Sequence, residues 1–384
     1  MFHRLPVAWL QMSHGWTRLF VALLGVLFAD LLMFVQLGFL NALYDSATKV
    51  QQQLGCQLVV ISPQSEAMYR MHPFPRRQLY RLLGHRGVEG VAPLYTGVGA
   101  WRNPETGTQR SIFVFGMEPF APALNVPGID ANFSAMRETD VCLFDGASRP
   151  EFGPVESWFH SGRPVVTELN RRHMKVVGIV TVGASFAADG NLVMSDSNFF
   201  RTFPNRNPGA IDVGLIRLHP GADIVAVQSD VRRLLGSDYK VMTVDEFIAF
   251  EKLYWAQNAP IGFIFTLGTI LGFVVGFIIT YQILYTDVSN HLSQYATLKA
   301  IGYTDGYLRK VVIQESLILS VLGFLPACAL SMIVYRVASE AIYLPLQMSW
   351  NRAIQVFLLT AIMCICSGLA AMRRLKSADP AEVF

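Results

Sequence analysis

The chain has 384 residues, of which 52% are hydrophobic and only 15% are charged. Soluble domains carry about 25% charged residues, so this composition indicates a protein that is partly embedded in a membrane and partly globular. The formal net charge of +3 is too small to indicate a nucleic-acid-binding protein.

Four segments are long and apolar enough to cross a bilayer, which takes about 20 residues of helix. They are residues 19–43, 260–285, 316–335 and 353–372. The second and third contain no charged residue. The first contains Asp30 and is too long for the apolar core of a signal peptide, so we expect it to remain in the protein as a membrane anchor.

The distribution of lysine and arginine predicts the orientation of these spans. Three segments are expected on the same side of the membrane: the one before span 1, the loop between spans 2 and 3, and the one after span 4. Together they contain eight basic residues, whereas the loop between spans 3 and 4 contains two. The positive-inside rule therefore places both termini in the cytoplasm of a multi-pass inner-membrane protein. Residues 1–18 become a cytoplasmic interfacial segment, 286–315 a cytoplasmic loop, 336–352 an outer loop and 373–384 a cytoplasmic tail.

Residues 44–255 must then lie outside the membrane, and they are numerous enough to bury a core of their own. Their 21 basic and 21 acidic residues give them no electrostatic preference for a charged ligand. β-Branched, partly alternating runs predict strands, and periodic apolar patterns between start and stop signals predict helices. The strands are expected at 57–62, 110–117, 174–182 and 211–218, and the helices at 76–83 and 224–235. We therefore expect a large α+β extracytoplasmic domain between transmembrane helices 1 and 2.

Two apolar stripes connect this domain to the spans. One continues at helical spacing past the end of span 1, and the other follows a capping box formed by Thr243 and Glu246. They predict stalk helices at 40–54 and 243–258 that carry the domain. The alternative is that both stripes are ordinary core faces.

Several motifs of enzymes and metal sites are absent from the sequence. No glycine is followed by lysine, so the chain has no phosphate-binding P-loop, and it has neither H-E-x-x-H nor C-x-x-C. We find no catalytic constellation and expect no cofactor or metal bound by this chain. Cys56 and Cys142 would be able to form a disulfide in an extracytoplasmic domain, but nothing in their spacing demands it.

Small and acidic residues within the spans suggest two further features. Gly268, Gly272 and Gly276 recur at four-residue spacing, which lets helix backbones approach closely. This face is either the seam of a homodimer or a packing face within one four-helix bundle. Asp30 is either a functional acid or a structural polar contact, and we favour the contact because the expected spans contain no other acid and no histidine that would complete a proton relay.

The cytoplasmic loop contains the stretch YATLKAIGYTDGYL, residues 295–308. Its first part fits a short amphipathic helix that ends at Gly302, where a tight turn at positive φ needs glycine. A new helix follows and leads into span 3. A short helix held across the membrane surface can insert into a groove on another protein. The alternative is a helix that lies on the lipid, which the few flanking basic residues disfavour.

This stretch carries a resemblance to a known family. Residues 291–327, HLSQYATLKAIGYTDGYLRKVVIQESLILSVLGFLPA, resemble the coupling segment of FtsX/MacB-like ABC-transporter permeases. They resemble most closely the DevC subgroup, the permeases of heterocyst-type glycolipid exporters, as do residues 28–47, 193–204, 260–288 and the terminal MRRLKSADPAEVF. The resemblance implies a four-span permease, itself not an enzyme, that forms a homodimer and recruits two copies of a separate ABC ATPase, which binds ATP and Mg²⁺.

The resemblance also implies residue roles and partners. The residues that would contact the ATPase are Tyr295, Leu298, Lys299, Ala300, Ile301, Gly302 and Tyr303. ATP-driven dimer closure would move the stalks, and the external domain would work with a periplasmic adaptor and an outer-membrane channel to export a glycolipid or other hydrophobic cargo. The alternatives are a permease for lipoprotein release or for control of cell-wall hydrolases. A membrane sensor with an external ligand-binding domain is disfavoured, because the cytoplasmic segments hold no output domain.

Overall fold

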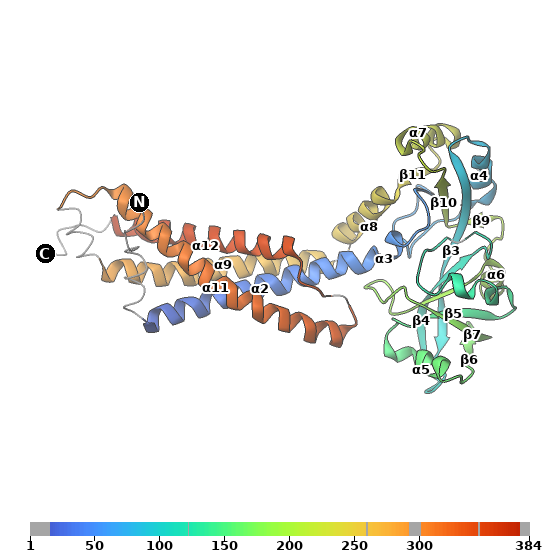
Figure 1. Cartoon of the computed structure of the whole chain (residues 1–384), viewed down its shortest axis with the longest axis horizontal. Coiled ribbons are helices and arrows are strands. Elements are labelled where there is room, and N and C mark those ends of the chain that lie inside the picture. Colours follow the sequence, from blue (N-terminus) through green and yellow to red (C-terminus); the bar gives the residue numbers. More distant parts are fainter. Residues whose placement is uncertain (1–15, 122, 259, 292–300, 345, 377–384) are drawn as a thin grey trace. The chain divides into compact units, whose positions relative to one another are not determined.

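The computed structural model describes residues 16–121, 123–258, 260–291, 301–344 and 346–376 (Figure 1). The chain divides into two compact units. The helical unit comprises the residues up to Ala42 and from Pro260 onward. The α+β unit comprises Leu43–Ala259.

Four long helices make up the described part of the helical unit. They are α2 (Trp16–Ala47), whose last turn enters the α+β unit, α9 (Pro260–Asn290), α11 (Asp305–Ile342) and α12 (Trp350–Lys376). Each is long and apolar enough to cross a membrane. The four helices extend past the four apolar segments expected from the sequence, because polar residues at their ends continue the same helical hydrogen bonding.

The helices of this unit pack side by side around a buried seam (Figure 1). Met33 and Phe34 of α2, Tyr335 of α11 and Val356 of α12 share one buried cluster. The Tyr335 hydroxyl donates a hydrogen bond to the backbone carbonyl of Phe34, which ties α11 to α2. Large aliphatic side chains on the outer faces of all four helices remain exposed, as expected of surfaces that contact lipid.

A nine-stranded mixed sheet forms the frame of the α+β unit. Its strand order is β11-β1-β10-β3-β4-β8-β5-β7-β6. The bounds are β1 (Leu58–Ile61), β3 (Val88–Arg102), β4 (Gln109–Met117), β5 (Val141–Asp145), β6 (Val166–Leu169), β7 (Arg172–Val180), β8 (Asn191–Ser195), β10 (Val213–Leu218) and β11 (Lys240–Thr243). Neighbours are antiparallel except β4 with β8 and β5 with β7. Trp101 of β3 also pairs with Leu169 of β6, so the strands from β3 to β6 close on themselves.

Helices and a short ribbon complete this unit. The helices are α3 (Lys49–Gln52), α4 (Arg76–Tyr80), η1 (Arg81–Gly84), η2 (Asp130–Asn132), η3 (Ala135–Arg137), η4 (Pro150–Phe152), α5 (Val155–His160), α6 (Asp196–Thr202), α7 (Ile224–Leu235) and α8 (Val244–Asn258), and the ribbon pairs β2 (Phe74–Pro75) with β9 (Ala210–Ile211). Alternate residues of each central strand enter two different cores. In β1, for example, Leu58 and Val60 pack into one core and Val59 and Ile61 into the other.

The expected strands and the expected helix at 224–235 are found, whereas the helix expected at 76–83 is divided into the α-helix α4 and the 3-10 helix η1. The four predicted strands overlap β1, β4, β7 and β10, and the helix predicted at 224–235 coincides with α7. The capping box is formed as expected: the Thr243 amide donates to Glu246 Oε2 at 2.9 Å, and the Glu246 amide donates to Thr243 Oγ1 at 3.1 Å. The sequence pattern did not reveal β3, β5, β6, β8 or β11.

The possible disulfide between Cys56 and Cys142 is not formed, and both cysteines are free. Cys142 is fully buried in the same core as Leu58, whereas Cys56 packs against the other core. The two thiols therefore lie on opposite faces of the sheet, which excludes the short Cβ separation that a disulfide needs.

Candidate functional site

The expected ATPase-contacting segment is described only at its end. Tyr295, Leu298, Lys299 and Ala300 lie outside the described residues. Gly302 has a φ angle of +103°, and a Cβ added there would have no neighbour within 4 Å. The turn therefore needs glycine for its backbone conformation rather than for space.

Apolar side chains are exposed around this turn. Ile301 is 71% exposed and Tyr303 is 42% exposed. Thr304 is the N-cap residue of α11, and its carbonyl accepts a hydrogen bond from the Tyr307 amide at 2.9 Å. The rings of Tyr303 and Tyr307 lie with centroids 4.6 Å apart. The entrance to α11 thus presents an exposed isoleucine beside a tyrosine pair, on a turn that glycine makes possible.

The glycine face of α9 packs against α2 of the same chain. A Cβ on Gly276 would lie 2.6 Å from the Ala29 Cβ, and one on Gly272 would lie 3.3 Å from the Met33 Cγ. A Cβ on Gly268 would meet the flexible end of the Gln36 side chain. Close packing within one bundle therefore accounts for the spacing of these glycines, and a homodimer seam on this face stays a prediction.

Asp30 is fully buried in the helical unit. Its Oδ1 accepts a hydrogen bond from the Thr360 hydroxyl at 2.5 Å, which links α2 to α12. Its Oδ2 has no hydrogen-bond partner among the described residues. The contact with Thr360 is the kind of structural polar contact that the sequence led us to favour, and this role of Asp30 stays a prediction.

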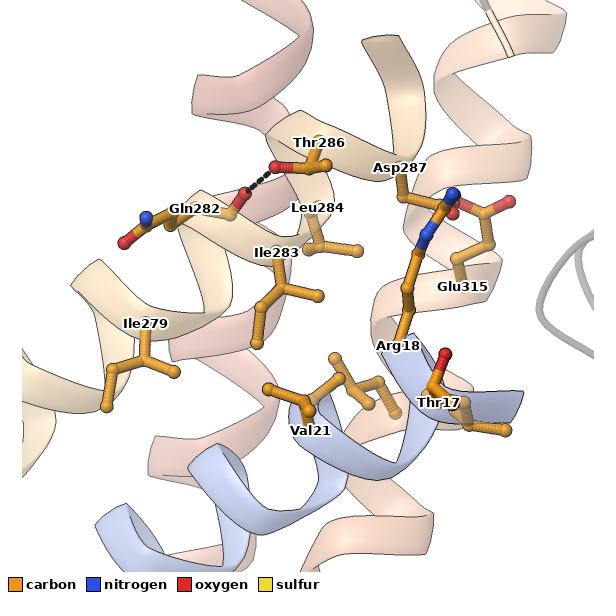
Figure 2. Close-up of a pocket in the computed structure, with 13 residues that line it drawn as sticks. Thr17, Arg18, Val21, Ile279, Gln282, Ile283, Leu284, Thr286, Asp287 and Glu315 are labelled. Carbon is orange, nitrogen blue, oxygen red and sulfur yellow. Dashed lines mark hydrogen bonds between the residues drawn. The ribbon is translucent and has the colours of Figure 1, made fainter. Parts of the chain in front are cut away.

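A cavity of about 480 Å³ lies in the helical unit between α2, α9 and α11 (Figure 2). Arg18 points across it toward Asp287 and Glu315 (Figure 2). The sequence pattern did not single out either acid, because each lies just outside the apolar run that defined its span. Asp287 follows the run that ends at residue 285, and Glu315 precedes the run that begins at residue 316. Glu315 is nevertheless 0% exposed, because α11 carries it into the bundle one residue before that run begins.

A further buried acid lies on α8, within the α+β unit. Glu251 is 1% exposed; it accepts hydrogen bonds from the Met68 amide at 2.8 Å and from the Trp255 indole at 3.0 Å. The Tyr69 and Tyr254 hydroxyls share a hydrogen bond of 2.6 Å beside it. Burial raises the pKa of Glu251 to about 7, and these donors only partly oppose that rise. Glu251 therefore joins the last helix of the unit to the loop after β1.

Models of two protein families match the chain. The family described as the MacB-like periplasmic core domain matches residues 19–234. The family described as the FtsX-like permease C-terminal matches residues 255–380. Together they cover the long first helix, most of the α+β unit and the last three long helices.

Curated relatives agree with these matches. Uncharacterised ABC transporter permeases from two Mycobacterium tuberculosis strains, CDC 1551 / Oshkosh and ATCC 25618 / H37Rv, are each 22% identical to this chain over 316 residues. The alignment covers 81% of this chain and 79% of each relative. The similarity therefore extends across both units.

Two of the solved structures with similarity to the chain are a periplasmic region and an extracellular domain. The periplasmic region of MacB from Actinobacillus actinomycetemcomitans is 11% identical, with a TM-score of 0.38 over 51% of this chain and 92% of that one. The extracellular domain of the transporter YknZ from Gram-positive bacteria is 16% identical, with a TM-score of 0.35 over 49% of this chain and 98% of that one.

Proposed function

The chain belongs to the MacB/FtsX-like family of ABC-transporter permeases, and we propose that it is the membrane subunit of an exporter driven by a separate ATPase. A permease of this family lacks an ATPase domain, so ATP must be handled by a partner. The sequence agrees, because no glycine in it is followed by lysine and a P-loop cannot form. The purified chain alone should hydrolyse no ATP.

The observation that carries the proposal is the exposed turn before α11. Ile301 presents an aliphatic side chain on a turn that Gly302 holds at a φ angle of +103°. An exposed apolar side chain beside a rigid turn is suited to insert into an apolar groove of a partner. We assign the docking of two ATPase copies to the segment from Tyr295 to Tyr303.

Two substitutions test this docking without altering a span. Gly302→Val places a β-branched residue at positive φ and strains the turn. Ile301→Asp places a charge in an apolar groove, which costs several kcal/mol when the charge is left unpaired. Both variants should insert into the membrane as the wild type does but lose co-purification with the ATPase and lose export. Gly306→Ala is the matched control, because its added Cβ would approach only Thr304 Oγ1 at 3.6 Å.

The orientation of the chain belongs to the same proposal, with both termini and the turn in the cytoplasm. A cysteine-free version with Glu105→Cys should react with an impermeant maleimide in intact spheroplasts, since Glu105 is exposed in the α+β unit. A version with Gly306→Cys should react only after the membrane is opened. Labelling of Gly306→Cys in intact spheroplasts would contradict both the orientation and the docking of a cytoplasmic ATPase.

The transmission of motion and the remaining partners complete the proposal. Two copies of the chain form a homodimer, and ATP-driven closure moves stalk helices at 40–54 and 243–258. In the range 40–54, the structure contains the end of α2, up to Ala47, and α3 (Lys49–Gln52). In the range 243–258 it contains α8 (Val244–Asn258). The external domain then acts with a periplasmic adaptor and an outer-membrane channel.

The cargo we propose is a glycolipid or another hydrophobic molecule, as in the DevC subgroup. The support is the resemblance of residues 28–47, 193–204 and 291–327 to that subgroup. A comparison of the lipids of a deletion strain with those of the parent tests this assignment. Loss of a surface glycolipid is expected, whereas unchanged lipids with retained lipoproteins at the inner membrane would favour the lipoprotein-release alternative.

A further inference from the structure

The cavity between α2, α9 and α11 combines apolar walls with charged groups at one end. Val21 of α2 and Ile279 and Ile283 of α9 line its apolar part. Arg18 and Glu315 lie together at the other end (Figure 2). A volume of about 480 Å³ falls in the range of pockets that hold small ligands. This division between apolar and charged lining suits an amphiphile.

The charges at this end are incompletely paired among the described residues. Asp287 faces the imidazole of His291, with Oδ1 and Nδ1 3.7 Å apart. Glu315 is 0% exposed, neither of its oxygens accepts a hydrogen bond, and no ion pair in the described part of the chain includes it or Arg18. A buried carboxylate without a cation is costly, and a positively charged donor in the cavity would offset its desolvation.

We propose that this cavity binds a phospholipid with a primary amine in its headgroup, phosphatidylethanolamine. Its ammonium would donate hydrogen bonds to Glu315, its phosphate would accept them from Arg18, and an acyl chain would lie along Ile279 and Ile283. A guanidinium binds phosphate well because its N–H groups form a planar fork. The cavity thus offers one partner to each part of this lipid.

Other lipids leave part of the site without a partner. Phosphatidylglycerol would supply a phosphate to Arg18 but no cation to Glu315. Phosphatidylcholine carries a cation that has no N–H to donate. A neutral glycolipid would bring hydroxyl groups but no charge for either side chain. The proposed lipid is therefore distinct from the proposed cargo, and its assignment does not depend on the identity of that cargo.

The experiment uses the full chain, purified in detergent, stripped of lipid and titrated with each of the three phospholipids in native mass spectrometry. The wild type should bind phosphatidylethanolamine at least about tenfold more tightly than phosphatidylcholine, because hydrogen bonds to a charged partner are strong. Glu315→Gln keeps the shape of the side chain and should remove this preference. Arg18→Gln should weaken the binding of phosphatidylethanolamine and phosphatidylglycerol alike.

Glu340→Gln is the matched control, because it makes the same chemical change on the same helix at an exposed position. It should keep the lipid preference of the wild type. Equal binding of the three lipids by the wild type would overturn the proposal, as would an unchanged preference in Glu315→Gln. High-yield disulfide formation between two copies of a Val21→Cys variant would also overturn it, because a second chain would then cover the cavity.

Discussion

The two units differ in how they treat buried acids. In the α+β unit, Asp145 accepts hydrogen bonds from the amides of Ala147, Val182 and Gly183 and from the Asn191 side chain, at 2.8 to 3.1 Å. Each of the three fully buried acids described in that unit accepts at least two hydrogen bonds; they are Asp145, Asp212 and Glu251. These three acids thus find hydrogen-bond donors within the unit itself.

The helical unit leaves its buried acids with fewer partners. Asp30 accepts one hydrogen bond, from Thr360, and Glu315 accepts none among the described residues. A lipid-exposed helix satisfies its own backbone but offers few donors to a buried side chain. The fully buried acids of the α+β unit therefore receive donors from that unit, whereas Glu315 of the helical unit is available to a further partner. Four substitutions test or sharpen this contrast.

The largest effect is expected for Asp145→Ala. It leaves the buried amides of Val182 and Gly183 and the side-chain amide of Asn191 without their acceptor inside a core, which should destabilise the α+β unit by about 3–5 kcal/mol. Denaturant-dependent thiol labelling of the buried Cys142, resolved by mass spectrometry, measures this loss. Asp189→Ala is the control, because Asp189 makes only surface ion pairs with Arg110 and Arg149 and should cost less than about 1 kcal/mol. Equal losses in the two variants would contradict the central role of Asp145.

Glu251 should make the α+β unit lose stability as the pH rises. Burial raises its pKa from 4.5 to about 7, so between these values the folded state holds a proton that the unfolded state releases. The stabilisation is complete below about pH 4.5 and is lost as the pH rises through 7, with a total on the order of 3 kcal/mol. Hydrogen exchange of the Met68 amide, corrected for its intrinsic pH dependence, should show this loss. The Glu251→Gln variant should not lose stability over this pH range. The assignment would be refuted if the exchange of the Met68 amide in this variant changed with pH as it does in the wild type.

Gly276→Ala should weaken the helical unit by about 1–3 kcal/mol, because the new methyl group has no room beside Ala29 and Met363. Gly268→Ala is the matched control, since the end of the Gln36 side chain can move away from the added methyl group. Thermal exposure of the buried Cys364 to a thiol-reactive dye reports on this unit. If Gly268→Ala destabilises the helical unit more than Gly276→Ala does, the assignment of a close contact between α9 and α2 at Gly276 is contradicted.

The smallest effect is expected for Asp30→Asn. The amide oxygen retains an acceptor for the Thr360 hydroxyl, so stability should change by less than about 1 kcal/mol and export should persist. Thermal labelling of Cys364 and export in the same strain are the measurements. A folded variant that exports nothing would show that Asp30 acts as a titrating group rather than as a structural contact.

Much of the fold could be predicted from the sequence, because its signals are local. Long apolar runs identified the four spans, and the helix over 224–235 followed from its own periodicity. The capping box of Thr243 and Glu246 needs only two residues three apart. The family followed from the segment around Gly302, whose turn also appears at positive φ.

Only the tertiary structure decided features that depend on distant partners. The strand β3, which the sequence pattern did not reveal, pairs with β4 and β10 and also touches β6, so its formation depends on distant segments. Placing Cys56 and Cys142 on opposite faces of the sheet needed the strand register. Glu315 looks like an ordinary polar residue at a helix end, and it becomes a buried acid only where α2 and α9 pack around α11. A sequence fixes the local preferences of a chain, but burial is set by which segments meet, and that depends on the whole fold.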